Sequence, residues 1–256
     1  MSALTDKVYA VTGGSQGFGF AIAQALVASG AKVGLIARRA DRLDKAVAQL
    51  GAGKAHSVVA DICKGSEVKN AFREIAEHFG RRDGLVNNAG VARPGAIEEI
   101  PEEDLRLQFD INVIGLVLCC QAAIPMIKGG ANPRIVNIGS ASANYREEIR
   151  HLGIYAATKA AVDRLTAELR DEVKADGIGV SLVVPGAAMT EFSAGWDDER
   201  LRKAVGAWQE QGTHMDTGME PSDVADAVVY CLGCRPGVGI DELIVRPNKP
   251  TPKFQF

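Results

Sequence analysis

Several common signals are absent from this sequence. Its five cysteines, spread over 256 residues, do not make a disulfide framework. Lysine and arginine (29) nearly balance aspartate and glutamate (32), and no basic arm or stripe indicates a nucleic-acid partner. The residues before Lys7 lack the apolar core of a signal peptide, and Cys231-Leu-Gly-Cys234 lacks the further ligands that zinc requires. We therefore expect a cytoplasmic protein without a metal site.

A long uninterrupted apolar run is also missing. The longest, Ile111 to Ile127, is short for a lipid bilayer and contains Asn112, Gln121 and Pro125. It is typical of a buried helix, so we expect no membrane partner. Apolar residues make up 46% of the chain, which is enough to form a full core and excludes general disorder.

What the sequence contains is a regular alternation of short apolar runs with helical patterns. The runs predict strands over 7–12, 32–37, 55–60, 84–87, 134–138, 180–184 and 240–245, and the helical patterns cover 19–29, 41–50, 66–79, 101–127, 154–174 and 222–231. Such alternation predicts an α/β fold with one doubly wound parallel sheet of seven strands and helices on both faces. No linker divides residues 1–256, so we expect a single domain with a variable loop at about 186–220 and a tail at 246–256.

The first predicted strand runs directly into a glycine-rich turn, Thr12 to Gly19, and a helical pattern follows. Glycines at 13, 17 and 19 permit a tight turn and a close approach of the backbone to a pyrophosphate at the helix N-terminus. The same residues also fit G-x-S-x-G around Ser15, the nucleophile turn of α/β-hydrolases. Only twelve residues precede Gly13, too few for the earlier loop that such a hydrolase needs for its oxyanion hole.

A phenol and an ammonium stand four residues apart at Tyr155 and Lys159, on a predicted helix. This spacing places both side chains on one helix face. A fixed positive charge favours the phenolate, so we expect Lys159 to lower the pKa of Tyr155 toward neutrality.

These motifs together resemble the short-chain dehydrogenase/reductase family. They occur in the family's order along residues 7–245: the turn at Thr12–Gly19, Asn87-Asn-Ala-Gly90, Asn112, Ile138-Gly-Ser140, Tyr155-x-x-x-Lys159, and Pro185-Gly186 followed by Thr190. The resemblance implies a Rossmann-type fold and an NAD(P)-dependent enzyme acting on CH–OH groups. It predicts a secondary alcohol or ketone as the small-molecule substrate.

The resemblance also implies a role for each matching residue. Tyr155 would exchange the proton with the substrate oxygen, Lys159 would lower its pKa and bind the nicotinamide ribose, and Ser140 would hold the substrate oxygen. Asn112 would support a water chain behind the lysine. The cofactor would contact the glycine turn, the loops after later strands and the catalytic pair: Gly13, Ser15, Gln16, Gly17, Phe18, Gly19, Arg38, Arg39, Asp61, Ile62, Asn88, Ala89, Gly90, Tyr155, Lys159, Pro185, Gly186 and Thr190.

The position of the serine leaves an alternative open. The family's serine usually stands thirteen residues before the tyrosine, which in this chain is Ser142, whereas Ser140 stands fifteen before it. We favour Ser140 because it directly follows the predicted strand, and a short insertion in the following loop is inexpensive.

The end of the second predicted strand predicts the choice of cofactor. In NAD-binding proteins an acidic residue about twenty positions after the glycine turn holds the ribose 2′-hydroxyl, whereas arginine accommodates the 2′-phosphate of NADP. Here Ala37 stands at that position and Arg38 and Arg39 follow. We therefore expect NADP(H) to be preferred, with Arg38 contributing most.

Two further expectations concern assembly and the alternative function. The predicted helices at 101–127 and 154–174 carry apolar faces that include Val117, Leu118, Cys119, Ala161, Leu165 and Leu169. Similar proteins pair these helices, so we expect a homodimer or homotetramer. The alternative function is a catalytically silent NADP-binding regulator of the same fold; the presence of all four predicted catalytic residues disfavours it.

Overall fold

The computed structural model describes residues 3–51, 53–143, 150–186, 188, 193, 196–211 and 219–248. Its centre is a parallel sheet of seven strands in the order β3-β2-β1-β4-β5-β6-β7. The strands are β1 (Val8–Thr12), β2 (Lys32–Ala37), β3 (Ala55–Val59), β4 (Gly84–Asn87), β5 (Arg134–Ile138), β6 (Gly179–Pro185) and β7 (Glu242–Val245). The predicted fold class is confirmed, and the predicted strands match the observed ones to within two residues at each end.

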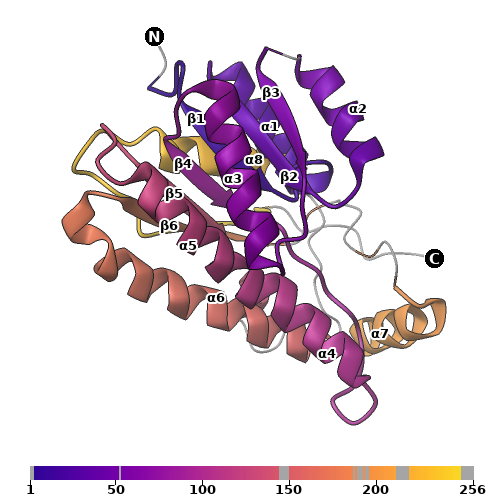
Figure 1. Ribbon diagram of the computed structural model, residues 1–256. Helices are drawn as coiled ribbons and strands as arrows, with labels where there is room; N and C mark the ends of the chain where they lie inside the picture. The colour runs from indigo at the N-terminus through magenta and orange to yellow at the C-terminus, as the bar shows by residue number, and fades with distance from the viewer. Residues whose placement is uncertain are drawn as a thin grey trace.

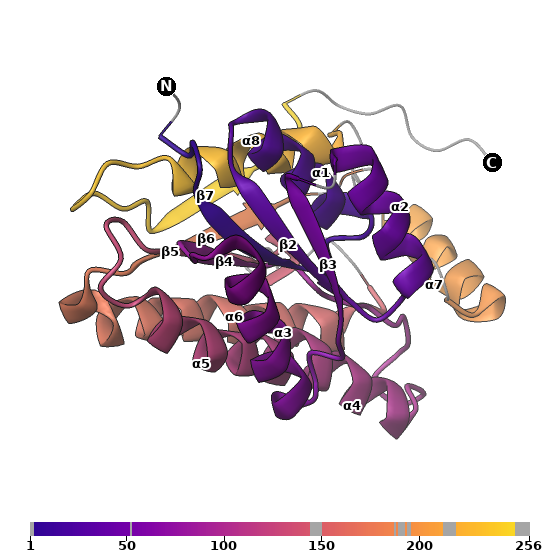
Figure 2. The same ribbon diagram turned by 45° about the horizontal axis from the view of Figure 1, so that its top comes forward.

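Helices cover both faces of the sheet (Figures 1 and 2). One layer contains α1 (Gly17–Ala28), α2 (Ala40–Leu50) and α8 (Pro221–Leu232), and the other contains α3 (Gly65–Phe79), α5 (Leu116–Ile127) and α6 (Gly153–Glu172). Each layer forms its own core with one face of the sheet. Because both faces are covered, central strands such as β1 are buried at every residue, and they appear in the sequence as continuous apolar runs.

The strand order creates a crevice between β1 and β4. The chain runs from β1 outward to β3 and then returns to β4 on the other side of β1. The loops that follow β1 and β4 therefore leave the sheet in opposite directions, which is where open α/β sheets bind their ligands.

The predicted helix at 101–127 is one segment with a change of helical type in its middle. It consists of α4 (Glu102–Phe109), a π-helical turn η1 (Asp110–Gly115) and α5. Pro101, where the sequence predicted the helix to begin, is instead the N-cap of α4. The stretch Glu102–Ile127 is long and apolar enough to cross a membrane, but half of its apolar window is buried inside the structure. It is a core helix, as its polar interruptions predicted.

One helix was not predicted. Within the segment expected as a variable loop, α7 spans Asp198–Gln211. Its sequence is rich in charge, which obscured an apolar stripe at i, i+3, i+4 and i+7: Leu201, Ala204, Val205 and Trp208. Figure 1 shows α7 beside α4, at the end of the molecule to which the carboxyl ends of the strands lead.

Candidate active site

The glycine turn joins the end of β1 to the start of α1. Gly13 and Gly17 adopt positive φ angles of 65° and 52°, which glycine accepts without strain. A Cβ on Gly19 would collide with the Gly13 carbonyl oxygen and with Asn88 Nδ2. Gln16 does not cap α1 with its side chain, and no acidic residue occupies the first turn of α1 in this described segment. The turn thus leaves the positive end of the helix to an anion.

The loop after β4 is fastened to this turn. Thr12 Oγ1 accepts hydrogen bonds from the backbone N–H groups of Asn88 and Ala89, both at 3.0 Å. Asn88 Nδ2 donates to the carbonyl oxygen of Thr12 at 2.9 Å. These contacts hold the two sides of the crevice at a fixed separation. Gly90 follows, and a Cβ there would lie 3.6 Å from Lys159 Nζ.

Basic side chains gather at the end of β2, where the sequence predicted a phosphate site. Arg38 and Arg39 are exposed, and Arg39 Nη2 donates to Gln16 Oε1 at 2.6 Å. Arg42 also donates to Gln16 Oε1, so two guanidinium groups converge on the glycine turn. Arg42 was missed in the sequence, although its i+3 spacing from Arg39 at the start of α2 could have indicated it.

Tyr155 and Ser140 are in contact. Tyr155 lies in the first turn of α6 and is 9% exposed, and its hydroxyl shares a side-chain hydrogen bond with Ser140. Ser142 lies behind this pair: its Oγ is 2.9 Å from Ser140 Oγ, and its backbone N–H also donates to Ser140 Oγ at 3.2 Å. Of the two candidate serines, Ser140 is therefore the one that the structure places on Tyr155.

Burial dominates the electrostatics of the pair Tyr155 and Lys159. It raises the pKa of Tyr155 to about 12, which the hydrogen bond with Ser140 opposes. The pKa of Tyr155 therefore lies above its ordinary value in this structure, and the lowering by Lys159 stays a prediction. The ammonium is 5.9 Å from the centroid of the Tyr155 ring, and it donates to the Ile138 carbonyl oxygen at 2.7 Å.

The pKa of Lys159 is lowered by the same burial, to about 8. The charge of Asp163 opposes this shift. Asp163 stands one helical turn further along α6, against the end of β5, where its Oδ1 would lie 3.1 Å from a Cβ on Gly139. The sequence analysis missed Asp163; its i+4 spacing from Lys159 was the available signal.

Asn112 links α6 to the loop after β4. The π-helical turn directs its side chain inward, where it is 1% exposed. Its Oδ1 accepts from the Val91 N–H at 2.8 Å, and its Nδ2 donates to the Val91 carbonyl oxygen at 2.8 Å and to Thr158 Oγ1 at 2.9 Å. Asn112 therefore fixes the backbone beside Lys159, and Thr158 is a further residue that sequence reasoning missed. π-helical turns inside α-helices occur frequently at functional sites.

The remaining predicted cofactor residues lie along the same edge of the sheet. Asp61 follows β3, and its Oδ1 accepts from the Cys63 N–H at 3.0 Å, while Ile62 is buried in the core. Pro185 ends β6, and the Gly186 N–H donates to the Val245 carbonyl oxygen at 2.8 Å. Ser15 and Phe18 are half-buried in the glycine turn. Thr190 lies outside the described residues.

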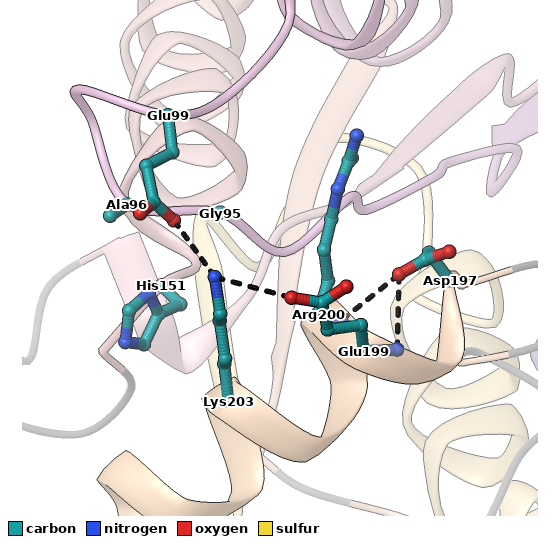
Figure 3. Close-up of a pocket in the computed structure, with 8 residues that line it drawn as sticks. All are labelled: Gly95, Ala96, Glu99, His151, Asp197, Glu199, Arg200 and Lys203. Carbon is teal, nitrogen blue, oxygen red and sulfur yellow. Dashed lines mark hydrogen bonds and ion pairs between the residues drawn. The ribbon is translucent and has the colours of Figure 1, made fainter.

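A charged cavity of about 290 Å³ lies between α7 and the loop after β4 (Figure 3). The lining residues are Gly95, Ala96, Glu99, His151, Asp197, Glu199, Arg200 and Lys203. Lys203 Nζ is 3.6 Å from both Glu99 and Glu199, so these charges balance one another. His151 accepts a hydrogen bond from the Gly95 N–H through its carbonyl oxygen, at 2.8 Å.

Comparison with known proteins identifies this arrangement. The family model described as short chain dehydrogenase matches residues 7–201. The chain belongs to the short-chain dehydrogenase family. An uncharacterised oxidoreductase of Staphylococcus aureus (strain MRSA252) is 32% identical over 247 residues, which cover 96% of this chain and 100% of the relative.

Solved short-chain dehydrogenase structures share the fold. A short-chain dehydrogenase from Burkholderia cenocepacia in complex with NADP has a TM-score of 0.82 and 31% identity, over 95% of this chain and 98% of that one. A 3-ketoacyl-(acyl-carrier-protein) reductase from Brucella melitensis complexed with NADH has a TM-score of 0.82 and 28% identity, over 94% and 97%. Membership of the short-chain dehydrogenase family makes the chain an NAD(P)-dependent oxidoreductase of small molecules, and these two structures differ in their nicotinamide cofactor.

The described residues fit such a cofactor. The turn before α1 is closely packed, since a side chain on Gly19 would collide with the Gly13 carbonyl oxygen, and the N-terminus of α1 has neither a side-chain cap nor an acidic residue in its first turn. Gly90 keeps the approach to Lys159 open, since a side chain there would stand against the ammonium. The uncapped helix N-terminus suits a pyrophosphate, and the open approach suits a ribose at Lys159.

Proposed function

We propose that this short-chain dehydrogenase is an NADP(H)-dependent oxidoreductase that interconverts a secondary alcohol and a ketone, with Tyr155 as the acid/base. The observation that carries the proposal is the hydrogen bond between the Tyr155 hydroxyl and Ser140, with Lys159 one helical turn away. A bound nicotinamide supplies or accepts the hydride.

The protein's own groups manage the oxygen of the substrate. Ser140 donates a hydrogen bond to that oxygen, and Tyr155 transfers its proton to it as negative charge develops. Because burial raises the pKa of Tyr155 to about 12, the phenol is protonated at neutral pH, which is the form that carbonyl reduction requires. The ammonium of Lys159 stabilises the phenolate that the transfer leaves behind.

The support for NADP(H) over NAD(H) is the chemistry at the end of β2. Ala37 offers no carboxylate to repel a 2′-phosphate, and Arg38 is exposed directly after it. Arg39 and Arg42 converge on Gln16, within the turn that would hold the pyrophosphate. Guanidinium groups form charge-assisted, paired hydrogen bonds with phosphate. We therefore propose Arg38 as the main contact, as the sequence predicted, with Arg39 and Arg42 supporting it.

The test is a coupled absorbance screen of the wild type with NADP+, NADPH, NAD+ and NADH over a broad panel of alcohols and carbonyl compounds. Turnover with NADP(H), lost in Tyr155→Phe, is the expected result. Tight NADPH binding without turnover on any member of the panel would instead indicate the catalytically silent regulator. Catalytic efficiency with NAD(H) equal to or above that with NADP(H) would contradict the cofactor preference.

We also propose a single-domain protein that works as a homodimer or homotetramer in the cytoplasm. Phe109 and Ile114 on the α4–η1–α5 segment are 40% and 48% exposed, and Val117 and Leu118 are half-buried beside them. The sequence analysis expected Cys119 on this surface. The residue instead lies fully buried in the core. Light scattering at micromolar concentration tests the assembly: Phe109→Glu should weaken it, and a monomeric wild type would contradict it.

A further inference from the structure

The inner face of α7 lies against the candidate catalytic tyrosine. Ala204 and Trp208 stand one turn apart on this helix, and they are 0% and 9% exposed. They form one buried cluster with Ala92, Leu152 and Tyr155. Val205 and Trp196 pack against the same cluster. We call these apolar residues around Tyr155 the aromatic cap.

Trp208 presents ring surface rather than a hydrogen-bonding group, and its ring meets that of Trp196. Trp208 Nε1 already donates to the Arg150 carbonyl oxygen at 2.7 Å, which fixes the orientation of its indole. The Trp196 and Trp208 rings meet edge to face, with centroids 6.4 Å apart and an angle of 71° between their planes. Such a pair offers a flat third ring both a face and an edge to pack against.

Charged groups of α7 pair with other charges and are not members of the cluster around Tyr155. Lys203 and Glu199 line the outer cavity with Glu99, as Figure 3 shows, and Arg200 pairs with Asp104 of α4. Asp104 is also 3.8 Å from Arg93. These ion pairs attach α7 to the body of the protein. Among the described residues, those of α7 that join the Tyr155 cluster are aliphatic or aromatic.

From this arrangement we infer that the substrate is a ketone or secondary alcohol that carries an aromatic ring, and that Trp208 is the residue that selects it. The inference rests on the proposed function and adds the substrate class. A sugar or a charged acid would lose water beside Tyr155 without gaining partners from the aromatic cap. A flat aromatic ring loses little and gains the contact with the indoles.

The first experiment compares kcat/KM for acetophenone, cyclohexyl methyl ketone, butan-2-one and acetoacetate with NADPH. In the wild type, acetophenone should be the best of the four. Trp208→Ala should lower kcat/KM for acetophenone about tenfold or more, while it changes that for butan-2-one by less than about threefold. Trp208→Phe should retain most of the preference because it keeps a ring. Gln209→Ala, on the exposed side of the same helix, is the matched control and should change nothing.

A second experiment measures binding without turnover. The chain contains only two tryptophans, Trp196 and Trp208, so its intrinsic tryptophan fluorescence reports on the aromatic cap alone. Titration of Tyr155→Phe with acetophenone in the presence of NADP+ should give quenching that saturates, unlike the linear increase of collisional quenching. Butan-2-one should give no saturable change.

The outcomes separate this inference from the proposed function. Turnover of butan-2-one or acetoacetate above that of acetophenone overturns the substrate class and leaves the oxidoreductase intact. An equal loss for all ketones in Trp208→Ala means that the indole only supports the fold, which overturns its selective role. If none of the four ketones is turned over, the titration decides: saturable quenching by acetophenone supports the aromatic site, and its absence overturns it. The coupled absorbance screen over alcohols and carbonyl compounds then tests the proposed oxidoreductase activity separately.

Discussion

The cofactor side and the substrate side of the candidate site are built in different ways. The cofactor side consists of loops at the ends of neighbouring strands, and the backbone N–H groups of Asn88 and Ala89 join two of these loops by donating to the Thr12 hydroxyl. The proposed substrate side includes, among the described residues, the helix α7, which contacts the body through side chains: Trp208 to the Arg150 carbonyl oxygen, Arg200 to Asp104, and Lys203 to Glu99. The first is fixed by the sheet, whereas the second depends on a few replaceable contacts. This difference permits one scaffold to serve many substrates.

The largest expected effect tests whether Tyr155, which lies between these two sides, carries out the proton transfer. Tyr155→Phe removes only the proton-transferring oxygen, and it should lower kcat by about 10²–10⁴-fold. Affinity for NADPH, measured by fluorescence, should be unchanged. Ser140→Ala should also reduce kcat strongly and Ser142→Ala weakly, since Ser140 contacts Tyr155 and Ser142 contacts only Ser140 among the hydrogen bonds of the described segment. The reverse order would assign the role to Ser142.

A substitution in the cofactor side should weaken NADPH binding and leave Tyr155 and Lys159 in place. In Gly19→Ala, the new methyl group would meet the Gly13 carbonyl oxygen and Asn88 Nδ2, so the turn must shift. We expect NADPH affinity to fall by about 100-fold or more, a loss of roughly 3 kcal/mol. Circular dichroism should show a folded protein. Unchanged affinity in the folded variant would mean that the turn is not the pyrophosphate site.

Residues for the proposed cofactor side could be named from the sequence because geometry restricts residue types there. Only glycine fits Gly13, at positive φ, and Gly19, at its close approach. The strands were equally clear, since burial on two faces produces continuous apolar runs. The substrate side carries no such restriction: α7 needs only an apolar stripe among charges, and Trp208 could be any large apolar residue. The π-helical turn at Asn112 was also missed, because one extra residue in a helix leaves no compositional mark.

The third prediction concerns the edge of the cofactor side at the end of β2. Ala37→Asp combined with Arg38→Ala introduces the carboxylate that favours a ribose 2′-hydroxyl and removes the guanidinium proposed for the 2′-phosphate. The ratio of kcat/KM for NADPH to that for NADH should fall by about 10–100-fold, which corresponds to roughly 1.4–2.8 kcal/mol. Arg42→Ala alone should produce a smaller fall. An unchanged ratio in the double variant would place the phosphate site elsewhere.

The fourth prediction is a shift in pH dependence within α6. Lys159 must be protonated to stabilise the phenolate, and burial lowers its pKa to about 8, so activity should decline as the pH rises through that value. Asp163 opposes the lowering. Removal of its charge in Asp163→Asn should therefore move the alkaline limb of the kcat profile to lower pH, with a loss of about two- to fivefold at pH 8. Asp171→Asn, exposed on the same helix, should leave the profile in place. A limb that does not move would show that Asp163 acts only in packing.

The fifth prediction tests whether α7 moves independently of the sheet. Gly206 lies inside α7, and a Cβ there would meet nothing within 4 Å. Alanine stabilises a helix interior by about 1 kcal/mol relative to glycine. If α7 opens locally, Gly206→Ala should slow amide hydrogen exchange in Asp198–Gln211 by about fivefold and leave exchange in β1 and β4 unchanged. Gly53→Ala, whose Cβ also meets nothing within 4 Å but lies outside any helix, is the control. Equal slowing of exchange in α7 and in the central strands would show that the two sides of the site open together, and the contrast between a fixed cofactor side and a separable substrate side would not hold.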